Sequence, residues 1–482
     1  MNIAFNDIRI DDKSLARVLG FACNRAWAYV CFFCIALFNT SASPQPSFLN
    51  SLYIGSILTL CATLTISALC PKRTWALLHS SVGQFVGPCA AAVGSALILF
   101  VSQGAHPLLF LAASSVLTGF GSGLLLLSWG ISFSELSLNR TVLESCIAFF
   151  LGVALYALIS VTSPLFQYLF AVAMPLLSGW LFANSRHPHQ ESDFAKPILA
   201  KEGIAFAKFL AGITLLGFIA GLTRDIQPST MQGELSDGYC TAIAIVTTFI
   251  IAVFLVIAKR SSTFEIEPLF RPALIAMLVG VLLLPVFGTS SLVPAAFVKS
   301  GYTCFELLVW IILNDLCHRF HFSPIQVFGF GRSVIAGAGV IGSLVAFTFL
   351  PGILEDQSQT VTLSAIIAIA LTTLSNLLFS HCNILDLLKN PVDPQATFKD
   401  RCDEVFDLFE LSPRQKEVAC LLAYGRDANY ISEKLFISKG TLNSHRLNIY
   451  RKMNIHSRQE LLDLILGEDQ EGHSPTKESP LA

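Results

Sequence analysis

A stretch of basic and amide side chains near the carboxyl end has residue types suited to binding a polyanion. Between residues 439 and 453 the chain carries Lys439, Arg446, Arg451 and Lys452 and no acidic residue. The surrounding segment 411–467 holds nine Lys and Arg against five Asp and Glu, a net charge of +4. Cations that neutralise phosphates release counterions and strengthen binding to nucleic acid. The pattern therefore predicts a nucleic-acid interface here.

A second set of ionisable residues interrupts long apolar stretches: Glu306, Lys299, Arg332 and Lys208. A charge at the centre of a bilayer costs about 2.5–3.5 kcal/mol on insertion scales, so it usually faces a cavity or a partner. Two interpretations of Glu306 stay open. It belongs either to a membrane ligand or proton site with Lys299 and Arg332, or to a structural ion pair with one of those cations. For Arg332 and Lys208, near predicted helix ends, we favour snorkelling to the interface.

Enzymatic and metal chemistry find no support in the spacing of residues. The histidines are scattered, and no Ser/His/Asp or paired-carboxylate arrangement can be argued. The one Cys-x-x-Cys pair, Cys31 with Cys34, lies in an apolar stretch without a second pair at zinc spacing. The sequence predicts no enzyme, no cofactor, no metal and no framework of disulfides.

The elements that carry these residues are mostly predicted membrane helices. The chain is 53% hydrophobic and 13% charged, whereas soluble domains carry about 25% charged residues. A spanning helix needs about 20 mostly apolar residues. Twelve candidates are predicted, at residues 20–39, 50–70, 77–101, 107–131, 142–161, 164–183, 204–223, 239–258, 272–288, 294–313, 327–350 and 360–380.

Basic residues in the loops predict the orientation of the bundle. Residues 1–19 form a charged leader without a convincing cleavage site, so a removable signal peptide is not expected. Among the loops on one side of the bundle, the only basic residue is Arg224. The loops on the other side contain Lys72, Arg73, Arg140, Arg186, Lys196, Lys201, Lys259, Arg260 and Arg319. The positive-inside rule makes this second set cytoplasmic, which predicts a multi-pass protein of the cytoplasmic membrane with both termini in the cytoplasm.

The longest polar cytoplasmic loop, 185–203, divides the spans into six-helix halves at 20–184 and 204–380. This layout resembles the major facilitator architecture, in which two six-helix halves surround a central cavity. The family's signature loop between spans two and three, Gly…Asp-Arg-x-Gly-Arg, is absent, since the chain has Cys70-Pro71-Lys72-Arg73-Thr74 there. That departure argues against active transport. Glycines four residues apart, such as Gly217 and Gly221, predict close helix packing.

Residues 381–410 form a predicted linker, because Pro391 and Pro394 interrupt any continuous helix. Its later part places apolar residues at three- and four-residue steps, which gives one apolar helical face, at Cys402, Val405, Phe406 and Phe409. Two interpretations are a solvated connector and a lead-in helix that packs on the next domain. We favour the second because of the paired Phe406 and Phe409.

Four short helices are predicted in segment 411–467. Ser412-Pro413-Arg414-Gln415 is a capping box with Pro at the first helical position, and Gly425 ends that helix. A second helix spans 428–435, and Ser438 caps a third that ends at Met453. Ser457-Arg458-Gln459-Glu460 is a second capping box, opening a fourth helix. This is a helix-turn-helix plan, whose third helix meets base edges through its N-terminal part. The tail 468–482 is polar and predicted to be disordered.

Four stretches at the family's spacing, without a gap, resemble the LuxR/FixJ family of DNA-binding domains. They are Leu411–Val418, Asn429–Ser432, Leu435–Arg446 and Ile449–Met453. The resemblance implies that Glu417 is a buried acid bracing the helices and that Asn443 and Ser444 occupy the base-reading positions. It places phosphate contacts at Lys439, Thr441, Arg446 and Lys452. Gly440 lies in the recognition helix, and the side chains at 443 and 444 are smaller than the common Lys and Asn. These departures predict an unusual or weak sequence preference.

The resemblance also implies partners. Family proteins bind double-stranded DNA as dimers, commonly through the fourth helix, where Leu461, Leu462 and Ile465 are candidate contacts. RNA polymerase is a further candidate partner, and the loops are too short to house a receiver domain. The leading interpretation is an all-α, membrane-embedded transcription regulator whose bundle senses an unknown signal, either a small-molecule effector or a membrane condition. The alternative is a major-facilitator-like transporter with a regulatory DNA-binding tail.

Overall fold

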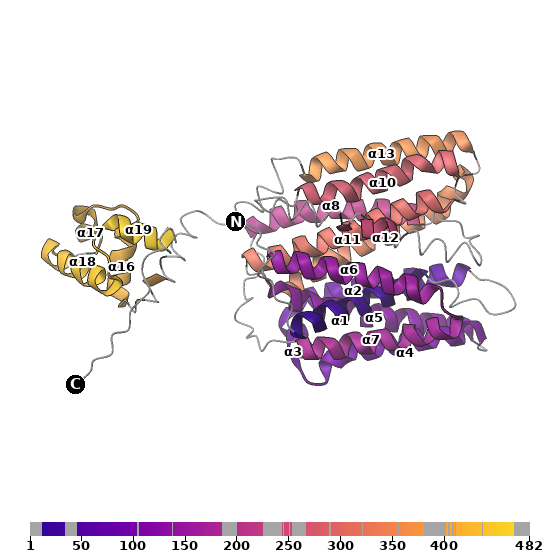
Figure 1. The fold of residues 1–482 in the computed structure, drawn as a ribbon, viewed down its shortest axis with the longest axis horizontal. Coiled ribbons are helices and arrows are strands. Elements are labelled where there is room, and N and C mark those ends of the chain that lie inside the picture. The colour runs from indigo at the N-terminus through magenta and orange to yellow at the C-terminus, as the bar shows by residue number, and fades with distance from the viewer. Residues whose placement is uncertain are drawn as a thin grey trace. The chain divides into compact units, whose positions relative to one another are not determined.

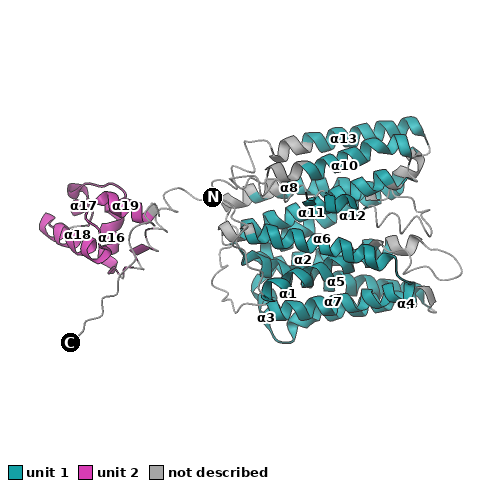
Figure 2. Cartoon of the chain, in the orientation of Figure 1, with its two compact units in different colours: residues 1–388 teal, residues 389–482 magenta. Residues whose placement is uncertain are grey.

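A computed structural model divides the chain into two compact units, an N-terminal unit of residues 1–388 and a C-terminal unit of residues 389–482 (Figure 2). The described residues are 12–33, 46–103, 106–136, 138–185, 200–224, 267–288, 291–320, 322–354, 356–379, 411–435 and 437–466, with isolated positions in 243–252 and 402–409. Residues 1–11, the loop 186–199, most of the predicted span 239–258, most of the predicted linker and the tail 468–482 lie outside them.

The N-terminal unit is built of helices (Figure 1). In its described part they are α1 (Asp12–Phe33), α2 (Pro46–Leu69), α3 (Pro71–His79), α4 (Gly83–Gln103), α5 (Pro107–Ser134), α6 (Leu138–Ser160), α7 (Pro164–Ser185), α8 (Ala200–Arg224), α10 (Glu267–Phe287), α11 (Leu292–Phe320), α12 (Pro324–Leu354) and α13 (Gln357–Phe379). Seven of the described helices are long and apolar enough to cross a membrane, and α8 and α10 contain shorter apolar stretches.

The first helix begins at Asp12, inside the predicted charged leader 1–19. The reason is a buried carboxylate on α6. Arg17 Nε donates to Glu144 Oε2 at 2.6 Å, and Ser14 Oγ donates to Glu144 Oε1 at 2.8 Å. Arg140 Nε also reaches Glu144 Oε1 at 2.8 Å. Because Arg17 is only 2% exposed, its charge is compensated within the bundle, and the helix extends back to Asp12.

The predicted third span, 77–101, is two helices in the structure. Helix α3 ends at His79 and α4 begins at Gly83. Ser80 separates them, because its hydroxyl accepts a hydrogen bond from the backbone N–H of Gly83 at 2.9 Å. A serine that satisfies a free N–H at a helix start favours a new helix over continuation of the old one.

Two groups of helices pack separately and then meet. In the first half, α1 packs on α6 and α7, and α5 packs on α2 and α4; in the second half, α12 packs on α8, and α10 packs on α11 and α13. The halves meet where α12 contacts α2 and α5 and where α11 contacts α6. At this junction the rings of Phe21 and Trp310 stack with centroids 4.4 Å apart. The core of the unit therefore runs through both halves.

The C-terminal unit contains α16 (Pro413–Ala423), α17 (Ala428–Leu435), α18 (Lys439–Met453) and α19 (Arg458–Leu466). Val418, Ile431, Ile449 and Leu461 are fully buried in its core. Cys402 and Phe406, from the predicted lead-in segment, are fully buried in the same core, and Val405 and Phe409 pack against it. These contacts explain the apolar spacing of that segment.

Glycines on α8 allow its close contact with α12. A Cβ on Gly217 would lie 2.5 Å from the carbonyl oxygen of Ile335, and one on Gly221 would overlap the carbonyl oxygen of Gly339. Gly337, on α12, differs from these two glycines because it has space around it. The nearest atom to a Cβ there would be Cys61 Sγ, at 3.7 Å. The small residues are therefore required on the face of α8 that touches α12.

We expect Gly221→Ala to lower the melting temperature of the purified full-length chain, because the two backbones must separate and overpacking typically costs about 1–3 kcal/mol. Gly337→Ala is the matched control. It should leave the melting temperature unchanged or slightly raised, since Ala favours a helix over Gly. Thermal denaturation in detergent measures both, and equal shifts would contradict the packing argument.

Candidate functional site

Local capping fixes where the recognition helix α18 begins and ends. Ser438 precedes the helix, and its hydroxyl accepts from the N–H of Thr441 at 3.1 Å, as predicted. The predicted capping box before α16 is also present, with Ser412 N–H donating to Gln415 Oε1 at 2.9 Å. Asn454, which the sequence analysis did not single out, ends α18 in the left-handed conformation with φ of 52°. Asn tolerates that conformation.

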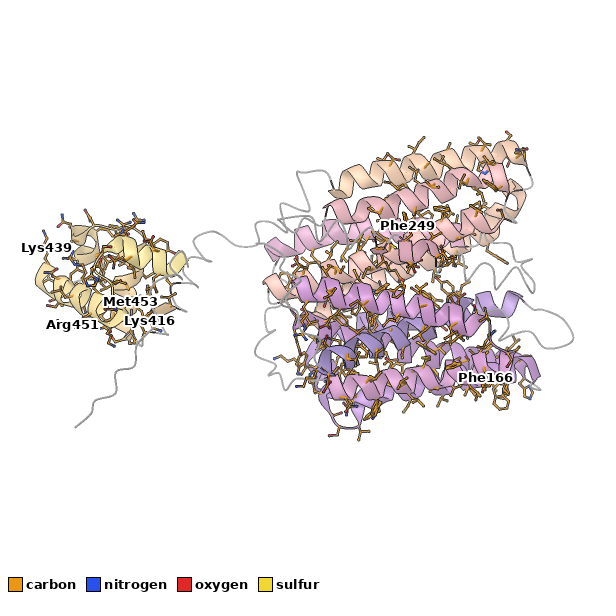
Figure 3. The ribbon with its side chains drawn as sticks, viewed as in Figure 1. Phe166, Phe249, Lys416, Lys439, Arg451 and Met453 are labelled. Carbon is orange, nitrogen blue, oxygen red and sulfur yellow. The ribbon has the colours of Figure 1, made fainter. Side chains whose placement is uncertain are left out.

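The surface of α18 carries the residues expected to meet DNA. Lys439, Thr441, Asn443, Ser444, Arg446 and Lys452 are all exposed. The opposite face buries Leu442, Ile449 and Met453. Figure 3 labels Lys439, Arg451 and Met453 on this helix. The helix therefore presents a polar and cationic face while its apolar face holds it to the unit.

Two of the predicted contact residues touch each other. Arg446 Nη2 donates to Asn443 Oδ1 at 2.7 Å. This contact occupies the amide oxygen of Asn443 and leaves its NH₂ group as the outward donor. Ser444 is held differently, since its hydroxyl donates back to the carbonyl of Gly440 at 3.1 Å. The geometry couples a predicted phosphate contact to a predicted base-reading residue.

A cation–aromatic cluster beside this helix was missed by the sequence analysis. Tyr430 on α17 is 39% exposed, with Arg426 Cζ 5.0 Å and Lys434 Nζ 5.5 Å from its ring centroid. Helix α17 packs on α18. The four-residue spacing of Arg426, Tyr430 and Lys434 in the sequence could have predicted this cluster. In a helix-turn-helix, the helix before the recognition helix crosses the DNA backbone, so this cluster extends the cationic surface.

The prediction that Glu417 is buried is wrong. Its side chain is 53% exposed and pairs with Arg414, whose Nη1 lies 2.5 Å from Glu417 Oε2. Arg414 Nη2 also donates to the carbonyl oxygen of Leu435 at the end of α17. Glu417 therefore supports the contact between α16 and α17 from the protein surface, because it holds Arg414, which bridges the two helices.

Two of the three dimer contacts predicted on the fourth helix, Leu461 and Ile465, are not at its surface. Leu461 and Ile465 are buried in the core of their own unit, and Leu462 is half-buried. The apolar spacing of α19 reflects packing within one copy. At the start of this helix the Glu460 carboxylate accepts from the backbone N–H of His456 at 2.8 Å and from the Ser457 hydroxyl at 3.0 Å. These hydrogen bonds lower the pKa of Glu460 and keep the cap charged.

Inside the N-terminal unit, Glu306 lies at a cavity of about 160 Å³ that both halves line. Glu306 Oε1 accepts from Arg332 Nη2 at 2.8 Å, and Oε2 accepts from Nη2 of Arg25. Lys299 lines the same cavity, with its Nζ 5.7 Å from the centroid of the Tyr302 ring. The structure thus brings the three predicted residues of the membrane site to one place.

One expectation about these charges is wrong, and one charge was missed. Arg332 does not snorkel, because its side chain is only 11% exposed and pairs with Glu306. Arg25 was missed, although it stands five residues inside the first predicted span, where a lone cation in an apolar stretch was the signal. The side chain of Lys208 lies outside the described part of the structure. The ion pair of Glu306 with Arg332, which belonged to one of the two open interpretations, is present, and Arg25 is a second partner of Glu306.

Comparison with known proteins agrees with the two units. The family model of bacterial regulatory proteins of the luxR family (GerE) matches residues 410–465. Over 56 residues, 12% of the chain, the sequence is 39% identical to the oxygen regulatory protein NreC of Staphylococcus carnosus (strain TM300) and 38% identical to the response regulator UvrY of Escherichia coli (strain K12). The match covers 26% of each relative, so the likeness concerns this domain alone.

Solved transporter structures resemble the helical bundle. A bacterial homologue of the iron transporter ferroportin, in an outward-facing state, aligns with a TM-score of 0.52 and 14% identity over 77% of this chain and 98% of that chain. The human organic anion transporter MFSD10 (TETRAN) aligns with a TM-score of 0.53 and 14% identity over 75% of this chain and 99% of that chain. At this identity the likeness concerns the fold. The chain thus joins a helical bundle with the fold of these transporter structures to a C-terminal domain of the luxR family type at residues 410–465.

Proposed function

We propose that this protein is a transcription regulator embedded in the cytoplasmic membrane, which binds double-stranded DNA through its C-terminal unit and senses a small molecule through its N-terminal unit. The observation that carries the proposal is the exposed, acid-free face of α18 on a luxR-family domain in the same chain as a membrane-type bundle with an internal cavity. A regulator of this kind needs both parts.

Binding to DNA uses the two kinds of side chain on α18 differently. Lys439, Thr441, Arg446 and Lys452 contact phosphates, which sets affinity and orientation. Asn443 and Ser444 meet base edges in the major groove, which sets sequence preference. Because Arg446 holds the amide oxygen of Asn443, Asn443 presents a donor to acceptors such as O6 or N7 of guanine and O4 of thymine.

The proposal places both termini in the cytoplasm. Lys72 and Arg73 are exposed at the start of α3, and Arg140 stands near the start of α6. These basic residues flank spans on the side that the positive-inside rule assigns to the cytoplasm. DNA binding requires the C-terminal unit on that same side. Two independent requirements therefore favour one orientation.

Dimerisation is part of the proposal because paired half-sites need paired recognition helices. With Leu461 and Ile465 committed to the core, a contact through α19 would use its outer side, with Gln459, half-buried Leu462 and Asp463. RNA polymerase remains a candidate partner of the bound dimer.

A second candidate function is transport with a regulatory tail. The cavity between the halves favours it, since residues of both halves line one space. The missing signature loop at Cys70–Thr74 argues against it. Transport requires net movement of a solute across the membrane, whereas sensing requires only binding. Uptake measurements in sealed vesicles therefore separate the two.

A fragment of residues 398–482 should bind duplex DNA with an affinity that falls as salt rises. Arg446→Ala should weaken binding to specific and random duplexes alike and reduce the salt slope by about 1. Asn443→Ala should mainly change preference, by about 1–3 kcal/mol between sequences. Mobility shifts over a salt series measure all three.

Arg458→Ala is the control for this series, because Arg458 is an exposed arginine on α19 rather than on α18. Its effect should be small. If Arg446→Ala and Asn443→Ala changed specific and random binding equally, the division of roles on α18 would be wrong.

The orientation is tested by protease access to the C-terminal unit. In inverted inner-membrane vesicles the unit should be cleaved, and in right-side-out spheroplasts it should be protected until the membrane is permeabilised. A periplasmic reporter fused after residue 466 should be inactive and a cytoplasmic one active. Protection in inverted vesicles would contradict the proposal.

A further inference from the structure

The short helix α3, at one end of the bundle (Figure 1), has one buried side and one exposed side. Thr74 and Leu78 are buried, and the Thr74 hydroxyl donates to the carbonyl oxygen of Cys70 at 3.2 Å. The helix contacts α2, α4 and α12. Its other side carries the exposed residues Lys72, Arg73, Ala76 and Leu77. Because the buried side holds α3 to the bundle, the exposed side keeps a fixed orientation.

The two cations of this exposed side have no compensating charge in the described structure. Neither Lys72 nor Arg73 has a hydrogen bond or an ion pair with a described residue. The sequence contains no Asp or Glu from residue 13 to residue 134. Two adjacent cations without an acidic neighbour create a local positive potential. The exposed side of α3 is therefore complementary to an anion.

Large apolar side chains are exposed next to these cations. Leu77 lies four residues after Arg73 and therefore on the same side of α3. Leu69, the last residue of α2, is 67% exposed, and Val82, in the connection to α4, is 78% exposed. Helices α2 and α4 are both long and apolar enough to cross a membrane, so this apolar surface continues the one that faces lipid. Inorganic phosphate would match only the cations, whereas an anion with hydrocarbon chains matches both features.

Trp75 indicates the depth of α3 in the membrane. It is half-buried, and its ring stacks on that of His79 with centroids 4.0 Å apart. Tryptophan is enriched where a bilayer meets water, and short helices with basic and apolar residues lie in that plane. Since α3 connects two spanning helices, it lies at the level of the lipid headgroups.

We propose that the exposed side of α3 binds an anionic phospholipid, with Lys72 and Arg73 at the headgroup phosphate and Leu69 and Leu77 against the acyl chains. Basic residues beside a membrane span attract anionic lipids in this way. Because α3 contacts α2 of the first half and α12 of the second, the lipid binds next to the junction of the halves. An effect of this lipid on DNA binding would rest on the proposed function; the lipid binding itself does not.

The test places the full-length chain in nanodiscs of zwitterionic phosphatidylcholine with a minor share of anionic phosphatidylglycerol. In one set only the phosphatidylglycerol carries bromine near the headgroup end of its acyl chains, and in the other only the phosphatidylcholine does. Bromine quenches tryptophan fluorescence on contact, and the difference from Trp75→Phe isolates the signal of Trp75. Phosphatidylglycerol should quench Trp75 more than its mole fraction predicts. Quenching in proportion to mole fraction would overturn the proposal.

Charge variants test which residues select the lipid. Lys72→Gln with Arg73→Gln should remove the preference for phosphatidylglycerol, with a loss of affinity of about fivefold for each cation, since each contributes about 1 kcal/mol near the surface. Both side chains are exposed, so the double variant should fold. Lys72→Arg with Arg73→Lys keeps the charge and should keep the preference. A preference that survives the double Gln variant would contradict the assignment.

Two controls address location and chemistry. Arg458→Gln removes an exposed arginine of the C-terminal unit and should leave the quenching of Trp75 unchanged, whereas Arg73→Gln alone should reduce it. Trp180 on α7 is 58% exposed, and its quenching should not respond to the changes at 72 and 73. Glycerol phosphate in solution supplies the phosphate without acyl chains and should not displace phosphatidylglycerol. Displacement would show a phosphate site in place of a phospholipid surface and would overturn the proposal.

Mobility shifts on the same samples keep the two proposals apart. A chain that selects phosphatidylglycerol at Trp75 and binds no DNA refutes the regulator and retains the lipid site. A chain that binds DNA and shows no lipid preference at Trp75 retains the regulator and refutes the lipid site.

Discussion

The buried carboxylate of Glu306 connects three helices of the bundle through ion pairs. An ion taken out of water loses several kcal/mol of hydration, and only close partners of opposite charge restore it. Glu306 receives those partners from α1 and α12, through Arg25 and Arg332. Removing one partner of such a buried pair costs about 3–5 kcal/mol. The two ion pairs therefore restrict how α1, α11 and α12 can lie relative to one another, in addition to the apolar core that these helices share and the close glycine contact between α8 and α12.

The C-terminal unit is stabilised by different interactions. It is too small for a large core, so its stability rests on a few fully buried residues, such as Phe406, Val418 and Ile449, and on serine caps at the helix starts. Its charges stay at the surface, where pairing contributes little. The cations of α18 lie on its exposed face, while its apolar face packs in the core. The exposed face can therefore meet phosphates without opening the core.

Sequence patterns predicted what depends on local chemistry and missed what depends on contacts distant in the chain. Helix spans, the Ser412 and Ser438 caps and the exposed face of α18 follow from periodicity and capping residues within a few positions. Arg25 and Glu144 were missed because their partners lie 281 and 127 residues away. Glu417 and Leu461 were misjudged for a related reason. The resemblance implied a role for each, whereas burial depends on how this particular core closes.

Arginine serves both units, and its surroundings decide how salt affects it. Exposed Arg446 acts through water, where charges are screened beyond about 8 Å at physiological ionic strength, whereas Arg25 is buried and largely unscreened. Salt therefore acts on DNA release at the surface of the C-terminal unit and has little effect on the buried Arg25–Glu306 pair. Coupling between two sites is reciprocal, so a small molecule bound by the N-terminal unit should change DNA affinity by the factor by which bound DNA changes the affinity for that molecule. If both factors equal one, the two units act independently, and sensing through the N-terminal unit is refuted.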